Sequence, residues 1–81
     1  MDEKIEEIIW VDSNGRGRWD SIESYMEYAK NENLECKTAG YVVYESDDRV
    51  AVVTSMSPKS YDGMMVIPKV AILNRVVMVK K

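Results

Sequence analysis

The chain of 81 residues has no histidine and only one cysteine, Cys36. One cysteine cannot form a disulfide within the chain, and it cannot build a zinc site alone. Without histidine, a Ser-His or Cys-His nucleophilic pair cannot form within one chain. We therefore expect no metal, no cofactor and no enzymatic activity, although an enzyme that relies on a hydroxyl or a lysine stays open.

Long apolar segments are also missing. Unbroken apolar runs reach only about four residues, whereas a membrane-spanning helix needs about 18 or more. The N-terminal MDEK is acidic and is not followed by the apolar stretch of a secretory signal. A lone cysteine suits a reducing compartment. These absences predict a cytoplasmic protein with no membrane partner.

The length predicts one domain covering residues 1–81. A domain of this size buries only roughly 60–65% of the surface that its unfolded chain exposes, so its stability is marginal. Disulfides, a metal or partner subunits usually supply the missing stability. Since the first two are excluded, we expect a homo-oligomer.

Charge is distributed unevenly along the chain. The net charge is −3 overall, but it is −6 over residues 1–35 and +3 over residues 36–81. If the two parts face different sides, one side of the protein could attract anions. An ordinary mixed surface is the alternative.

The N-terminal half predicts a strand and a helix. Residues 5–11 (IEEIIWV) end in β-branched and aromatic side chains, which favours a strand. Asp20 followed by Glu23 three residues later fits a capping box. Apolar residues at 22, 25, 26 and 29 then form one helical stripe. We expect a helix over about 20–32, capped by Asp20, ended by Asn31–Asn33 and covering one end of a sheet or barrel.

The C-terminal half, residues 36–79, predicts four further strands. Runs at 39–44 and 50–55 are apolar on both faces, so we expect each to be covered twice, on one side by a barrel interior. Gly40 indicates a bend or a close backbone approach. Asp47-Asp48 predicts a tight turn, Ser57–Gly63 a loop, and Met64–Ile67 a short strand. Pro68 then marks a junction before a last strand over 70–79.

Two stretches of this half resemble the motifs of the Sm/Lsm-like (Hfq-type) family of small β-barrels. Gly40-Tyr-Val-Val-Tyr-Glu-Ser-Asp47 is similar to a first motif of a glycine, alternating hydrophobic residues and a terminal aspartate. Val66-Ile67-Pro68-Lys69-Val70-Ala71-Ile72 is similar to a second motif. The resemblance implies a strongly bent, five-stranded antiparallel barrel and a cyclic ring. Pro68-Lys69 replaces the family's Arg-Gly type dipeptide, so the resemblance implies the fold more than base-specific RNA recognition.

A second resemblance covers nearly the whole chain. Trp10-Val-Asp12, Cys36-Lys-Thr-Ala-Gly40-Tyr-Val-Val43 and Ile67-Pro-Lys-Val-Ala-Ile72 match a pattern of small bacteriophage proteins of uncharacterised function. The resemblance implies a phage or prophage origin and, in that case, the cytoplasm of the bacterial host.

Basic and aromatic side chains at the strand junctions are the candidate ligand-binding residues. Lys69, Arg49 and Lys37 could meet phosphate, and Tyr61 could stack on a base. Within an Sm-like ring, the loops near Asp47 and near Lys69 would face the pore. We expect weak, salt-dependent binding of single-stranded RNA or DNA. Capture of a host protein or a nucleotide, or a purely structural role, are the alternatives.

Overall fold

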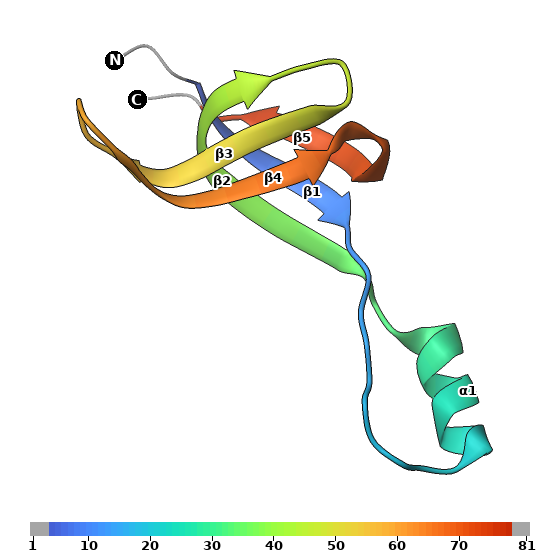
Figure 1. Cartoon of the computed structure of the whole chain (residues 1–81). Helices are drawn as coiled ribbons and strands as arrows, with labels where there is room; N and C mark the ends of the chain where they lie inside the picture. Colours follow the sequence, from blue (N-terminus) through green and yellow to red (C-terminus); the bar gives the residue numbers. More distant parts are fainter. Residues whose placement is uncertain (1–3, 79–81) are drawn as a thin grey trace.

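The computed structural model describes residues 4–78, which form one five-stranded antiparallel sheet and one α-helix (Figure 1). The elements are β1 (Ile5–Val11), α1 (Ile22–Asn31), β2 (Glu35–Glu45), β3 (Arg49–Met56), β4 (Tyr61–Pro68), the 3₁₀ turn η1 (Lys69–Ala71) and β5 (Ile72–Val77). The strand order is β4-β3-β2-β1-β5. The prediction of a mainly β protein with five strands and one helix is confirmed.

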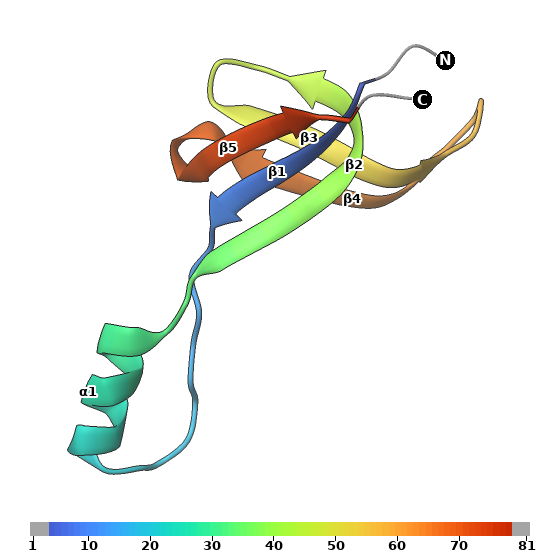
Figure 2. The same cartoon turned by 180° about the vertical axis from the view of Figure 1, so that it is seen from behind.

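Strong bending of the sheet depends on β2, whose two halves pair with different strands (Figure 2). Residues 35–41 of β2 pair with β1, and residues 41–45 pair with β3 with a register shift near Val43. A Cβ atom on Gly40 would lie 2.5 Å from the carbonyl oxygen of Val53. The close approach predicted at Gly40 is therefore confirmed, and only glycine fits there without displacing β3.

The core lies on the inner face of the bent sheet. Alternate residues of β1 point inward, and Ile8 and Trp10 pack with Val50, Val52 and Ile67. The indole Nε1 of Trp10 donates a hydrogen bond to the Thr38 hydroxyl at 2.9 Å, which satisfies its buried polar group. On β3, the residues from Val50 to Val53 are all buried, as expected for a strand covered on both faces. The same prediction is wrong for the run 39–44 of β2, where no residue is buried and Tyr44 is 57% exposed, because no second layer covers this part of the sheet.

Within residues 4–78, the sheet does not close into a barrel, since β4 and β5 each pair with one neighbour only. The helix also does not cover the sheet as expected. It lies at the end of a segment that projects away from the strands (Figures 1 and 2). The prediction that the helix covers one end of the sheet is wrong, because the segments on both sides of α1 lead away from the sheet.

The predicted helix needs correction at its start. The N-cap is Ser21, whose Oγ accepts a hydrogen bond from the backbone N–H of Ser24. Asp20 lies one residue earlier and accepts instead from the N–H of Ser21 and the hydroxyl of Ser24. At the other end the helix stops at Asn31, which lies within the predicted stop Asn31–Asn33 and one residue before the predicted end, and Glu32 after it is extended.

The last third of the chain differs from the prediction at two junctions. Strand β4 begins at Tyr61, so part of the expected loop is strand, and Gly63 in it has a φ of +69°. The expected strand over 70–79 begins only at Ile72, because residues 69–71 form η1. Val79 lies outside the described residues.

Candidate functional site

The two strand junctions singled out by the sequence lie next to each other. The backbone N–H of Lys69, at the start of η1, donates to the carbonyl oxygen of Asp48 at 2.8 Å. The tight turn between β2 and β3 is closed by a hydrogen bond from the N–H of Ser46 to the carbonyl of Arg49. Three of the predicted ligand-binding residues, Asp47, Arg49 and Lys69, therefore share one end of the sheet.

Both cations at this junction are already paired. The Lys69 ammonium lies 2.8 Å from a carboxylate oxygen of Glu45. The Arg49 guanidinium makes two hydrogen bonds to the carboxylate of Asp48, at 2.9 and 3.0 Å. These bonds, together with one from the Ser46 hydroxyl, lower the pKa of Asp48 to about 2. The local charge is thus largely balanced, which leaves less positive potential for a phosphate than the sequence suggested.

The other two predicted residues lie elsewhere. Lys37 sits on the outer face of β2, opposite Ile9 of β1 and toward the projecting segment. Tyr61 is exposed at the start of β4, opposite Met56, at the hairpin that joins β3 to β4. The structure does not bring Lys37 or Tyr61 to the junction formed by Arg49 and Lys69.

A charged network on the inner face was missed by the sequence interpretation. Arg75 of β5 makes two hydrogen bonds to Glu6 of β1, at 2.8 and 3.0 Å. It makes two more to Glu45 at the end of β2, at 3.0 and 2.9 Å. Glu45 then contacts Lys69, so four charged side chains form a continuous chain of contacts. The network joins β5 to the far half of β2 across the open side of the sheet.

One end of this network is buried, and the other end is partly exposed, since the Glu45 side chain is 39% exposed. Glu6 is buried, with only 4% of its surface exposed. Hydrogen bonds from Arg75, and then from Lys69, lower the pKa of Glu45 from its ordinary value near 4.5 to about 2. The same carboxylates raise the pKa of Arg75. The burial of Glu6 could have been predicted from the alternation of inward and outward residues along β1, because Glu6 lies on the same inward face as Ile8 and Trp10.

Large apolar side chains remain exposed on both edge strands. On β4 they are Met64, Met65 and Val66, and on β5 they are Leu73, Val76 and Val77. Unpaired strand edges with apolar side chains are templates for pairing with another chain.

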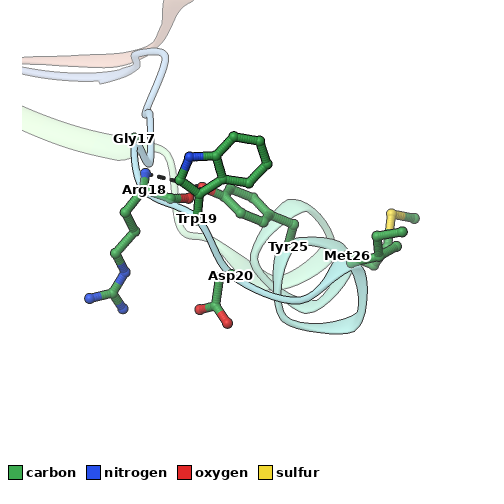
Figure 3. Close-up of a pocket in the computed structure, with 7 residues that line it drawn as sticks. Gly17, Arg18, Trp19, Asp20, Tyr25 and Met26 are labelled. Atoms are coloured by element: carbon green, nitrogen blue, oxygen red, sulfur yellow. Dashed lines mark hydrogen bonds between the residues drawn. The ribbon is translucent and has the colours of Figure 1, made fainter.

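The segment between β1 and β2, residues 12–34, forms a projecting arm that ends in α1 (Figure 1). The loop and the helix of this arm form a pocket of about 650 Å³ that is open to solvent. It is lined by Gly17, Arg18, Trp19, Asp20, Ile22, Tyr25 and Met26. In Figure 3, Trp19 and Arg18 extend to different sides of the loop. The Trp19 side chain is fully exposed.

Comparison with known proteins gives no relative: no family model, no curated protein and no solved structure matches this chain. Assignment of a function therefore depends on the surfaces of the molecule. Within residues 4–78, no helix is long and apolar enough to cross a membrane, and no group of three potential ligands could hold a metal ion. The arrangement that the structure does provide is a set of paired charges between two exposed, apolar strand edges.

Proposed function

We propose that this chain is a non-catalytic binding module that assembles into a cyclic homo-oligomer. The observation that carries the proposal is an excess of exposed surface. The chain exposes 6487 Å², whereas a compact monomer of 9.3 kDa exposes roughly 5,000 Å². The radius of gyration is 16.5 Å, against about 12 Å for a compact chain of this length.

The size of the excess supports a subunit with two neighbours. It is about 1,500 Å², and a standard interface buries about 800 Å² on each partner. A subunit of a closed ring contributes one patch to each of two neighbours, so it contributes two such areas. A two-fold dimer through one standard patch would leave about half of the excess exposed.

The sheet topology supports a specific mode of assembly. Strands β4 and β5 form opposite edges of the same sheet, and both carry exposed apolar side chains. Pairing β4 of one copy with β5 of the next would extend the sheet from copy to copy. The short turn η1 between the two edge strands lies at the junction that the sequence predicted at Pro68, before the last strand.

Native mass spectrometry and light scattering of the full chain test the assembly. We expect one discrete oligomer, and we expect Met65→Lys and Leu73→Lys to convert it to monomer because a lysine on an edge opposes pairing. Ser60→Lys, which adds the same charge at the tip of the β3–β4 hairpin, is the matched control and is expected to stay oligomeric. A wild-type chain that stays monomeric at high concentration would contradict the proposal.

Weak binding of single-stranded RNA or DNA is a second candidate function. It is favoured by the placement of Arg49 and Lys69 at one end of the sheet, because a ring would repeat both cations around its axis. Fluorescence anisotropy with oligo-U, oligo-A and mixed single-stranded DNA is the test. We expect binding only at low salt, because both cations are paired, and a steep loss of affinity as salt rises.

Lys69→Ala is expected to reduce that binding, and Lys59→Ala, which removes a cation from the distant hairpin, is the control. If no oligonucleotide binds at low salt, nucleic-acid binding is withdrawn. Mass spectrometry of the denatured oligomer would then show whether a nucleotide co-purifies, which separates nucleotide capture from capture of a host protein.

A further inference from the structure

The two segments at the base of the projecting arm, residues 12–34, are held together by polar contacts. The backbone N–H of Asp12 donates to the carbonyl oxygen of Leu34 at 3.0 Å. Two residues further along the chain, the side-chain Nδ2 of Asn14 donates to a carboxylate oxygen of Glu32 at 2.9 Å. Beyond this point both segments run away from the sheet (Figures 1 and 2). The Asn14 amide therefore ties the segment that leaves β1 to the residue that follows α1.

The residue after Asn14 is Gly15, and this combination occurs once in the sequence. The other asparagines, Asn31, Asn33 and Asn74, are followed by glutamate, leucine and arginine. Asparagine is a thermolabile residue, because the backbone nitrogen of the next residue can attack its side-chain amide carbon. Glycine has no Cβ, so its nitrogen is the least hindered for this attack. The sequence thus marks Asn14 as the most labile asparagine of the chain.

The folded loop brings the two reacting groups together. The Gly15 N–H donates to Oδ1 of Asn14 at 2.9 Å, so Cγ, which carries this oxygen, lies beside the Gly15 nitrogen. Reacting groups that are held in contact react faster than groups that must first find each other. A Cβ atom on Gly15 would meet nothing within 4 Å, so no neighbouring atom crowds this residue. Both residues are exposed, and residues 12–17 have no regular secondary structure, so water reaches the loop and its backbone can rotate.

We propose that Asn14-Gly15 is a self-modification site of this chain. The Gly15 nitrogen attacks Cγ of Asn14, so that a Cγ–N bond forms and the Cγ–Nδ2 bond breaks. The former amide nitrogen takes up the proton of the Gly15 N–H through solvent and leaves as ammonia, and a succinimide ring remains. Water then opens the ring. Opening at Cγ gives aspartate, and opening at the backbone carbonyl carbon gives isoaspartate, in which the chain continues through the side chain.

The reaction removes the atom that ties the base of the arm. The leaving Nδ2 is the donor to Glu32, and a carboxylate takes its place opposite the Glu32 carboxylate. Two like charges in this position repel each other. The net charge of the arm changes from −2, with five acidic and three basic residues, to −3. The base of the arm is therefore released as the protein ages. No partner takes part, so this release is independent of the proposed assembly.

Peptide mass spectrometry of the aged full chain tests the modification. Trypsin releases residues 5–16, with Asn14 as the single asparagine, whereas residues 31–37 and 70–75 carry the other three. In peptide 5–16 we expect the mass increase of an amide-to-acid exchange, with isoaspartate detected by enzymatic methylation. It should appear at least tenfold faster than in the other two peptides. Gly15→Ala is the matched control and is expected to slow the reaction at least tenfold, because its Cβ hinders the attacking nitrogen.

A synthetic peptide of residues 5–16 separates the effect of the fold from the effect of the sequence. We expect Asn14 in the folded chain to react at least as fast as in the free peptide, because the contact with Gly15 is already formed. A slower reaction in the folded chain would mean that the loop protects Asn14, and it would overturn the proposal. Equal rates for all four asparagines of the folded chain would overturn it as well.

Amide hydrogen exchange tests the release of the arm. Asn14→Asp reproduces one product, and we expect the Asp12 amide, which is bonded to Leu34, to exchange at least fivefold faster in this variant. Aged protein should show the same change relative to fresh protein. Adding Glu32→Gln supplies a side-chain amide that can donate to the new carboxylate, so it is expected to restore slow exchange. Unchanged exchange in Asn14→Asp, or no recovery with Glu32→Gln, would refute the release.

Discussion

Replacement of Arg75 by leucine is the most direct test of how the open sheet is held together. Arg75 connects Glu6 on β1 with Glu45 on β2 through four hydrogen bonds. The leucine would leave the nearly buried carboxylate of Glu6 without its partner. It would also release β5 from the distant half of β2.

The expected cost follows mainly from the burial of Glu6, which is 4% exposed, because the Glu45 side chain is 39% exposed. Removing one partner of a buried ion pair typically costs about 3–5 kcal/mol, because the remaining charge is left desolvated. Arg75 is 28% exposed at its side chain, so water can reach the site and the lower end of that range applies. We expect Arg75→Leu to lower the free energy of unfolding by about 3 kcal/mol. That is a large share of the total for a domain of 81 residues.

Urea unfolding followed by Trp10 fluorescence measures this cost, at one fixed protein concentration because assembly adds to stability. Lys69→Ala is the comparison, since its pair with Glu45 is partly exposed and is worth less than about 1 kcal/mol. The double variant Glu6→Leu with Arg75→Leu removes both charges and is expected to recover most of the loss. If Arg75→Leu costs no more than Lys69→Ala, the network does not hold the sheet.

Three further predictions follow from individual contacts. Gly40→Ala is expected to cost about 1–3 kcal/mol in urea unfolding, because its Cβ would lie 2.5 Å from the backbone oxygen of Val53. Ser21→Ala is expected to destabilise α1 by about 1 kcal/mol, measured by amide exchange, and Asp20→Ala by less, since Ser21 is the N-cap. Glu45 contributes stability above its unfolded pKa near 4.5, and this is lost as the pH falls toward its folded pKa of about 2. Because this group is partly exposed, we expect a loss of about 1 kcal/mol, absent in Glu45→Gln.

Local sequence patterns predicted the strands well because β-branched runs and turn residues act over short distances. The strand over residues 5–11, the turn at Asp47-Asp48 and the close approach at Gly40 are confirmed. The position of α1 was not predictable in this way. Its apolar stripe indicates that something covers the helix, but a stripe does not say whether its own sheet or another molecule does so.

The candidate site was predicted only in part for a similar reason. The Sm-like resemblance implied that the loops near Asp47 and Lys69 face the same pore, and in the structure the two loops are joined by the hydrogen bond from the Lys69 N–H to the Asp48 carbonyl. The carboxylates that pair with Arg49 and Lys69 depend on the register of β2 and on the residue at which η1 begins. The sequence pattern around Pro68 did not show where η1 begins. Glu6 and Arg75 are 69 residues apart, and they meet only because β5 returns to pair with β1.

The charged network also bears on how a ring would close. The number of copies in a cyclic assembly depends on the angle between the two surfaces that each copy uses. In this chain the two edges are β4 and β5, and the short turn η1 connects them. Lys69 in that turn and Arg75 in β5 both bond to Glu45, so one carboxylate fixes both segments relative to β2. In the proposed assembly, we expect the main role of Lys69 to be to fix the angle between the two strand edges. Contact with a ligand would be its secondary role. A Glu45→Gln variant that assembles into a different number of copies, with the same fold, would separate these two roles of Lys69.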